Sequence, residues 1–248
     1  MVTKSQHFPY QHPTFGRKSS PKAASAWQRS AYYWWFEYLK RHPGYARTCA
    51  QGGRGRYAAL YQDFGDVHAA DFRTWWAEGD RGARLFAEPI ITREVRLLST
   101  EELASVEPDP NVAFVQMPLN LPKRYLKQTF AKLLLKHHKG RRGVRQARNS
   151  QARYPVHGQP NMPALQITLQ VYDFRQTHPE LTLWQIGEQL RLFQLEQLVA
   201  DGDTRLTIAN KRSIMAATVS RYLRKAQAMI DNVAEGRFPD VRKVKKND

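Results

Sequence analysis

The chain has 248 residues and carries 39 Lys and Arg against 22 Asp and Glu, a formal net charge of +17 at pH 7. Apolar residues make up 42% of the chain, which excludes a fully disordered protein, and a single cysteine excludes a disulfide framework or a cysteine-based zinc finger. No run of about 18 apolar residues occurs, and residues 1–7 lack the apolar core of a secretory signal, so we expect a soluble, intracellular, basic protein.

The first part of the chain combines a proline-containing arm with a dense aromatic segment. Residues 1–25 hold three prolines, several serines and little apolar periodicity, which predicts a flexible arm. Residues 32–38 are aromatic at six of seven positions, and Ser25 or Ser30 can cap a helix that ends near Arg41. A helix that is apolar on nearly every face must be largely buried. We therefore predict an aromatic-rich helical domain over residues 26–107, with a stacking platform for unpaired bases as the alternative.

Short elements are expected within that domain. Residues 51–56, QGGRGR, lack the Gly-Lys-Ser/Thr ending of a phosphate-binding loop and predict a connector. Residues 57–61 and 71–76 predict short helices, and residues 88–98 predict a strand. Residues 99–110 are acidic and contain two prolines, which indicates a domain boundary.

A strand and a basic helix are predicted over residues 108–139. The apolar run at residues 112–119 predicts the strand, and Pro122 suits the first turn of a helix that reaches His138. We expect this helix to pack through its apolar stripe and to present a basic outer face. The stripe consists of Leu126, Phe130, Leu133 and Leu134. Residues 140–160 contain glycine, proline and arginine with few apolar residues, and predict a mobile basic linker.

The helical period returns in residues 161–236. One helix is expected from Met162 to about His178, a second is capped by Thr182, and a third begins near Asn210. Three helices ending in a basic one are typical of a helix-turn-helix unit, in which the last helix enters the major groove. The connector over residues 191–209 is longer than usual, so an ordinary three-helix bundle is the alternative. A basic tail, residues 237–248, completes the chain.

The predicted fold class is mainly α with a minor β element. It comprises the helical N-terminal domain and the C-terminal three-helix, helix-turn-helix-like unit.

Two long segments without carboxylates concentrate the positive charge. No Asp or Glu occurs in the 63 residues between Asp109 and Asp173, and none occurs between Asp203 and Asp231. Together these gaps hold 17 bases, which equals the net charge, so the rest of the chain is neutral. A carboxylate facing a phosphate backbone adds repulsion, so a polyanion-binding surface should lack acids as well as collect bases. With a pI of about 10.2, the chain is expected to bind nucleic acid.

The candidate nucleic-acid contacts come from these two gaps. Lysine and arginine side chains contact phosphates, and serine and threonine side chains can reach phosphates or nucleotide bases without filling a groove. The first gap supplies Lys123, Arg124, Lys127, Lys132, Lys136, Lys139, Arg141, Arg142, Arg145, Arg148 and Arg153. The second gap supplies Lys211, Arg212, Ser213, Thr218, Ser220, Arg221, Arg224 and Lys225.

One segment carries a family resemblance. Residues 31–45, AYYWWFEYLKRHPGY, resemble the N-terminal signature of bacterial transcriptional-regulator-like proteins found on mobile elements. That signature runs Ala-Trp, two residues, Leu-Arg-Arg-Asn-Pro, one residue, Tyr. Here Lys40 and His42 replace the usual Arg and Asn, and the extra aromatic residues are atypical. Residues 181–230 also look like the helix-turn-helix part of similar proteins. The resemblance implies DNA binding and transcription regulation, and it supplies no contact residue.

No catalytic or metal-binding constellation is predicted. Adjacent His137 and His138 cannot point the same way on a helix, which makes them a poor metal pair. Asp63, Asp66 and Asp71 could form the carboxylate cluster of a two-metal nuclease, but their glycine-containing context favours turn and cap residues. We expect no enzymatic activity and no cofactor or metal.

The sequence thus favours a sequence-specific DNA-binding protein, a transcription regulator of a bacterial mobile element that lies in the cytoplasm with the nucleoid. Its expected partner is duplex DNA, and a homodimer or a larger nucleoprotein complex is left open. The alternative is a subunit of a nucleoprotein assembly that binds RNA or single strands.

Overall fold

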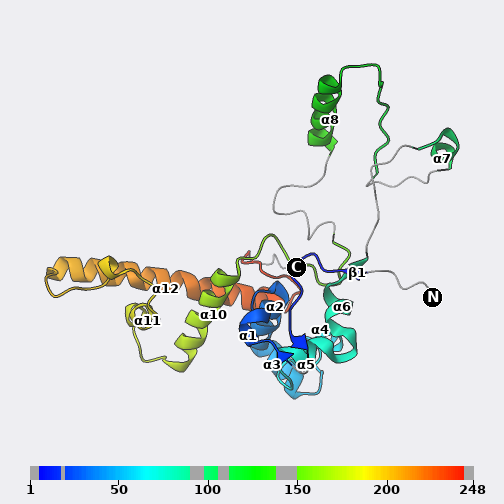
Figure 1. Cartoon of the computed structure of the whole chain (residues 1–248). Coiled ribbons are helices and arrows are strands. Elements are labelled where there is room, and N and C mark those ends of the chain that lie inside the picture. The colour runs from blue at the N-terminus through cyan, green and yellow to red at the C-terminus, as the bar shows by residue number, and fades with distance from the viewer. Residues whose placement is uncertain (1–5, 18–19, 90–97, 106–111, 138–149, 243–248) are drawn as a thin grey trace. The chain divides into compact units, whose positions relative to one another are not determined.

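The computed structural model describes residues 6–17, 20–89, 98–105, 112–137 and 150–242, and the structural statements below concern these residues. The chain divides into two compact units: unit 1 joins residues 1–89 to residues 143–248, and unit 2 spans residues 90–142. Helices dominate both units, and two small antiparallel sheets occur in unit 1 (Figure 1). This confirms the predicted mainly α fold with a minor β element.

Unit 1 begins with short helices and paired strands. Its N-terminal helices are α1 (Ala24–Trp27), α2 (Ala31–Lys40), α3 (Pro43–Ala50), α4 (Ala58–Phe64), α5 (Phe72–Ala77), the 3-10 helix η1 (Glu78–Asp80) and α6 (Arg81–Phe86). In the sheets, β1 (Gln6–His7) pairs with β4 (Glu88–Pro89), and β2 (Gly16–Arg17) pairs with β3 (Ser20–Pro21). The C-terminal part of unit 1 contains α10 (Met162–Thr177), α11 (Leu183–Gln189), the 3-10 helix η2 (Leu195–Gln197) and α12 (Arg205–Val233).

The aromatic helix α2 begins and ends where the sequence predicts. The Ser30 hydroxyl accepts a hydrogen bond from the backbone N–H of Tyr32 at 3.3 Å, and Arg41 is the C-terminal cap. Tyr32, Trp35 and most of the other aromatic side chains of α2 are buried. The segment therefore forms a core, as predicted, and offers no stacking platform for unpaired bases.

Both ends of the chain contribute to this aromatic core. The Trp35 ring centroid lies 5.4 Å from that of Phe86 and 5.5 Å from that of Phe238, and the Tyr38 hydroxyl donates to the Leu165 carbonyl at 3.0 Å. The predicted division into separate domains over residues 26–107 and 161–236 therefore differs from the structure. The reason is that α2 is apolar all round, so its neighbours in sequence cannot cover every face, and C-terminal residues complete the cover.

Two segments expected to be mobile pack on the same core over their described residues. Phe8 and Phe15, within the predicted arm, contact the core, and β1 pairs with β4. Within the predicted linker, Val156 is buried, and the Tyr154 hydroxyl donates to the Asp63 carboxylate at 2.6 Å. Proline and serine favour a mobile segment, but burial of the large aromatic side chains stabilises the packed conformation more strongly here.

The segment that carries the family resemblance stabilises unit 1. Arg41 donates to the Asp173 carboxylate at 2.7 Å and also pairs with Glu37. His42 caps α3, because its Nδ1 accepts the backbone N–H of Tyr45 at 2.9 Å. The buried Tyr45 hydroxyl donates to the Gly65 carbonyl at 2.6 Å.

The capping role of His42 predicts a pH dependence of folding. Burial lowers the pKa of His42, an effect that the charges of Asp231 and Glu235 partly oppose. The unfolded chain then binds the proton more readily than the folded chain, so stability is full above about pH 6.5 and falls as the pH drops through the lowered value. His42→Asn keeps an N-cap acceptor and removes the titration. We expect denaturant unfolding at pH 7.5 and 5.5 to show a smaller acid loss for this variant than for the wild type. Equal acid losses would contradict the prediction.

Other short elements of unit 1 also match the sequence. Residues 51–56 form the connector between α3 and α4, where Gly53 has φ of 88° and a Cβ would meet the Tyr61 ring at 2.4 Å. Asp71 caps α5 by accepting the backbone N–H of Thr74 at 2.9 Å. Of the strand predicted over residues 88–98, β4 covers Glu88–Pro89, and residues 90–97 lie outside the described residues.

Unit 2 contains α7 (Thr100–Ala104), capped by Ser99, and α8 (Lys123–His137), which follows Pro122 as predicted. The strand predicted over residues 112–119 is wrong, since no part of this run is a strand and Phe114 is 50% exposed. An extended apolar run becomes a strand only where a partner completes its hydrogen bonds. The expectation that α8 is a packed helix is also wrong, because none of its side chains is buried.

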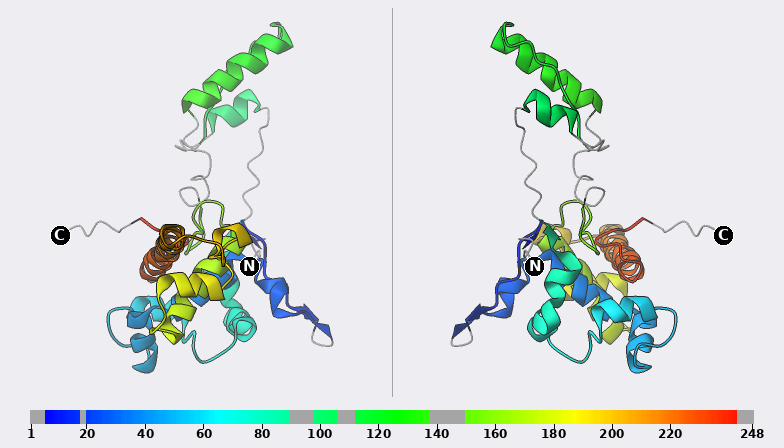
Figure 2. Two further views of the ribbon diagram at one scale, coloured as in Figure 1. Left: turned by 90° about the vertical axis from the view of Figure 1, so that its left-hand side faces the viewer. Right: turned by 90° about the vertical axis from the view of Figure 1, so that its right-hand side faces the viewer.

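The three predicted C-terminal helices are present and pack together around Val171, Ile186 and Val219. Asn161 caps α10 by accepting the backbone N–H of Ala164 at 3.0 Å. The third helix begins at Arg205 rather than near Asn210, because the Thr204 hydroxyl accepts the backbone N–H of Thr207 at 3.2 Å and caps it earlier. In Figure 2, where α12 is seen nearly along its axis, α10 and α11 lie to one side of it.

Candidate nucleic-acid interface

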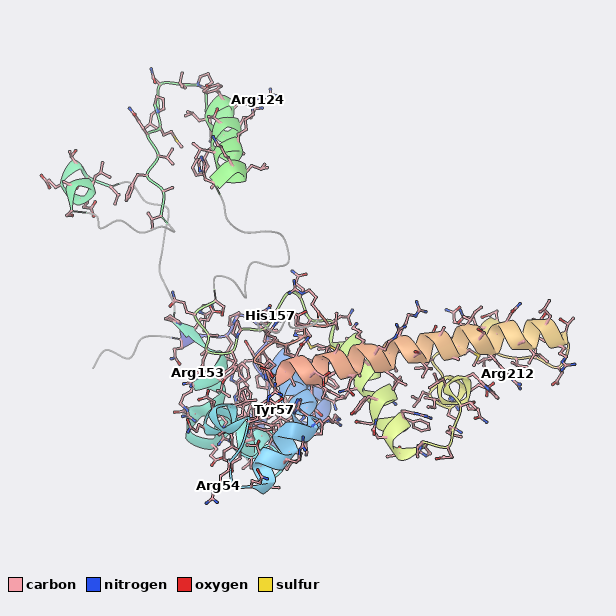
Figure 3. All side chains as sticks on the ribbon, turned by 180° about the vertical axis from the view of Figure 1, so that it is seen from behind. Arg54, Tyr57, Arg124, Arg153, His157 and Arg212 are labelled. Atoms are coloured by element: carbon pink, nitrogen blue, oxygen red, sulfur yellow. The ribbon has the colours of Figure 1, made fainter. Side chains whose placement is uncertain are left out.

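Helix α12 connects the aromatic core to the three-helix packing. Its C-terminal residues Met229, Ile230 and Val233 belong to the aromatic core, whereas Val219 packs with α10 and α11. The N-terminal half extends beyond the aromatic core, with α10 and α11 beside it (Figures 1 and 3). A long helix held at one end by the aromatic core thus presents one side of its other half to solvent, while the opposite side packs with α10 and α11.

The side of α12 opposite its buried stripe is exposed and carries no carboxylate from Arg205 to Ile230. Helical spacing places Ser213, Ala217 and Arg224 near the centre of this side, with Arg221 and Lys225 along one edge. All five residues are exposed. We call them the outward face of α12. No Asp or Glu lies between Asp203 and Asp231, so the one carboxylate of the helix is Asp231, about two turns beyond Arg224.

The two arginines of the outward face bond only to groups of their own helix among the described residues. Arg221 donates to the Thr218 hydroxyl at 2.9 Å, and Arg224 donates weakly to the Ser220 carbonyl at 3.5 Å. Neither partner is a carboxylate. Elsewhere in unit 1, by contrast, Arg41 and Arg56 form ion pairs. The outward face therefore keeps its positive charge available for an anion.

Lys211 differs from the other bases of α12. Its ammonium donates to the Asp203 carboxylate and to the Leu198 carbonyl, both at 2.8 Å. The hydrogen bond from Lys211 lowers the pKa of Asp203. Lys211 thus ties the connector between α11 and α12 to the helix, although the sequence places it among the candidate contacts.

Lys211→Met is expected to change the affinity for duplex DNA by less than about twofold, because its charge is already compensated by Asp203. Arg224→Met should weaken binding about eightfold at 0.1 M salt, the effect of losing one phosphate contact. Fluorescence anisotropy with a labelled duplex measures both. An equal loss of affinity for the two variants would contradict the distinction between a basic side chain with an ion pair, Lys211, and one without, Arg224.

Arg212 stacks on a neighbouring helix. Its guanidinium carbon lies 4.2 Å from the ring centroid of Trp184 in α11. A cation over an indole ring at this distance is attracted by the ring's negative face, and the N–H groups at the edge of the guanidinium are left for other acceptors. The stack fixes this charge at the border between α11 and α12.

The connector between α11 and α12 packs closely despite its length. The backbone N–H of Leu192 donates to the Gly187 carbonyl at 3.0 Å, and Phe193 lies so near that a Cβ on Gly187 would meet its ring at 2.6 Å. Glycine at this position therefore allows α11, Phe193 and Val219 to approach. Because α12 continues into the aromatic core, the three helices share unit 1 with the aromatic segment instead of forming a separate domain.

The candidate residues of the first acid-free gap fall into three groups. Lys123, Arg124, Lys127, Lys132 and Lys136 are exposed on α8 in unit 2. Lys139, Arg141, Arg142, Arg145 and Arg148 lie outside the described residues. Arg153 belongs to unit 1, where it pairs with Asp63 at 2.8 Å, so its charge is partly compensated.

The carboxylates considered for nuclease chemistry have structural partners. Asp63 accepts from Tyr154 and Arg153, Asp66 accepts the backbone N–H of His68 at 2.8 Å, and Asp71 caps α5. No group of three or more His, Cys, Asp or Glu suited to a metal occurs in the part of the chain that the structure describes. Of the adjacent histidines, His137 ends α8 and His138 lies outside the described residues.

Sequence reasoning missed two features of this surface. Trp184 lies under Arg212, yet 27 residues separate the two, so no local pattern indicates the pair. Ala217 lies on the outward face between Ser213 and Arg224, and helical spacing from these two residues would have found it. Small side chains at such positions allow close approach of a ligand to the helix.

No helix in the described ranges is long and apolar enough to cross a membrane. Comparisons with protein-family models, with curated proteins and with solved structures found no match to this chain.

Proposed function

We propose that this protein binds duplex DNA in a sequence-specific manner through the outward face of α12. The observation that carries the proposal is the exposed side of this helix, free of carboxylates from Arg205 to Ile230, where Arg221, Arg224 and Lys225 follow the small residues Ser213 and Ala217. Arginine and lysine side chains without a carboxylate partner attract phosphates. Small side chains let a helix lie close to the edges of the nucleotide bases in the major groove. A role in transcription regulation is the further expectation that the resemblance in residues 31–45 supports.

The helical arrangement supports a duplex over a single strand. An α-helix fits the major groove of B-DNA, about 12 Å wide, and the half of α12 that extends beyond the aromatic core has the neighbours α10 and α11 on one side only. Recognition of unpaired bases relies on exposed aromatic platforms, whereas the aromatic residues of α2 are buried. The outward face itself contains no aromatic residue.

Binding-site selection from random duplex DNA tests this proposal. We expect the wild type to enrich a sequence motif. The enrichment should weaken when Arg224→Ala removes an arginine side chain from the centre of the outward face. Competition with single-stranded DNA and RNA of equal length completes the experiment. Failure to enrich any duplex, or stronger binding of RNA or single strands, would contradict the proposal.

A further inference from the structure

Exposed apolar side chains are concentrated in unit 2. The large apolar residues exposed there are Leu103, Val112, Phe114, Val115, Met117, Leu119, Leu121, Tyr125, Leu134 and Leu135. No side chain in the described parts of unit 2 is buried. Unit 1, in contrast, has a complete aromatic core without these residues. Unit 2 therefore carries apolar surface for which its own described residues supply no cover.

The apolar residues of α8 follow the spacing of a helix-pairing seam. Leu126, Phe130 and Leu133 are separated by four and three residues, and the same spacing continues to Lys123 and His137 at the two ends. Such a narrow 3.5-residue repeat is the pattern by which one helix packs against another. We call Leu126, Phe130 and Leu133 the seam of α8. Leu134 borders the seam with 46% of its surface exposed, and the seam residues are only partly covered.

The charges beside the seam have a single sign. Lys127 and Lys136 lie beside the seam and Lys123 lies in line with its start; all three are exposed, and α8 contains no carboxylate. In paired helices the charges that flank the seam choose the partner, and like charges oppose pairing of two identical helices. The phosphates of a DNA duplex would neutralise the lysine and arginine side chains of α8 but would leave its seam uncovered. A partner that covers the seam and satisfies the bases must combine apolar residues with carboxylates.

We infer that α8 is a docking helix for an acidic amphipathic helix of another protein. Seam residues of the partner would cover Leu126, Phe130 and Leu133, while its Asp or Glu residues would pair with the flanking lysines. The inference stands on unit 2 alone and is independent of DNA binding by α12. Two heptads provide little apolar area, so the charge pairs are needed for both affinity and choice of partner.

A synthetic peptide with the sequence of α8, in which its five Lys and Arg residues are replaced by Glu, is the probe. It keeps the seam and reverses the charge. The full-length protein should bind the labelled peptide, and a scrambled peptide of the same composition should bind much more weakly. Leu133→Asp, on the seam, should weaken binding by about thirtyfold or more, the scale of a central interface residue.

The matched control is Leu135→Asp, the same change two residues away. Leu135 is 87% exposed and points away from the seam, so this variant should bind within about threefold of the wild type. Circular dichroism of both variants verifies that helix content is retained. If both variants bind alike, or if the scrambled peptide binds as well, attraction is by charge alone and the inference is wrong.

Three further measurements separate other occupants of the seam. Sedimentation of the wild type that shows self-association sensitive to Leu133→Asp would assign the seam to a second copy. Co-sedimentation with phosphatidylglycerol vesicles that depends on Leu133 would assign it to a lipid surface. Displacement of the peptide by duplex DNA would assign α8 to nucleic acid. Each of these results would overturn the inference, and absence of all three together with seam-dependent peptide binding supports it.

Discussion

Neutralising the outward face of α12 is expected to flatten the salt dependence of DNA binding. Apart from Lys211, which is paired with Asp203, α12 carries five exposed bases. If each meets a phosphate, the slope of log K against log salt is about −4.5, and affinity falls about 500-fold between 50 and 200 mM salt. Changing Arg221, Arg224 and Lys225 to Gln leaves two contacts. The slope should then be about −1.8, with a loss of only about 12-fold over the same range.

The matched control removes three charges from other parts of unit 1. Arg47, Arg54 and Arg84 are exposed and lie outside α12, so their combined change to Gln alters the net charge equally. This variant should keep a slope near that of the wild type. Equal slopes for the two triple variants would show that binding follows total charge and not the outward face.

Trp35→Ala is expected to cost about 3–5 kcal/mol of unfolding free energy, a large part of the stability of a typical domain. Trp35 is fully buried, and its ring lies within 6.2 Å of those of Phe64, Phe86, Tyr154 and Phe238, measured between centroids. Truncation would leave a cavity between the two halves of the chain that build the core. Guanidinium unfolding, followed by far-ultraviolet circular dichroism, measures the loss.

Two variants test whether the loss comes from packing at this position. The indole Nε1 of Trp35 is buried and has no hydrogen-bond partner among the described residues. Trp35→Phe removes that unpaired donor and keeps an aromatic ring, so it should cost much less than Trp35→Ala. Tyr125→Ala truncates an aromatic residue that is 54% exposed in unit 2, and should change stability by no more than about 0.5 kcal/mol. A similar loss for Trp35→Ala and Tyr125→Ala would contradict the shared core.

Local features of the fold were predictable because a few residues determine them. Ser30 and Arg41 bound α2, and Asp71 and Thr182 mark the starts of α5 and α11. In each case a side-chain acceptor or a capping pair precedes a helical run. The start of α12 was missed because Thr204 and Asn210 are both acceptable caps, and the earlier one allows a longer helix.

Long-range packing was not predictable from local patterns. Residues 150–160 contain turn-forming and basic residues typical of a linker, yet Tyr154 and Val156 pack on the aromatic core. Residues 112–119 have the composition of a strand, but a strand also needs a partner, which no local pattern specifies. Both errors concern contacts between residues far apart in the chain.

The candidate interface was predictable in part. The gap between Asp203 and Asp231 correctly identified an exposed helix face without carboxylates, because absence of acids is visible in the sequence itself. The pairing of Lys211 with Asp203 was hidden, since seven residues of connector and helix lie between them and only the fold brings them together. The cation over Trp184 was hidden for the same reason.

Site-specific crosslinking tests the central claim, that the outward face of α12 contacts duplex DNA. The native Cys49 is buried, so Ala217→Cys would introduce one accessible thiol on that face for a photoactivated crosslinker. Ala77→Cys, at an exposed position at the end of α5, is the matched control. We predict that illumination of the complex with its selected duplex crosslinks DNA to position 217 and not to position 77. Crosslinking from position 77 with none from position 217 would contradict the claim.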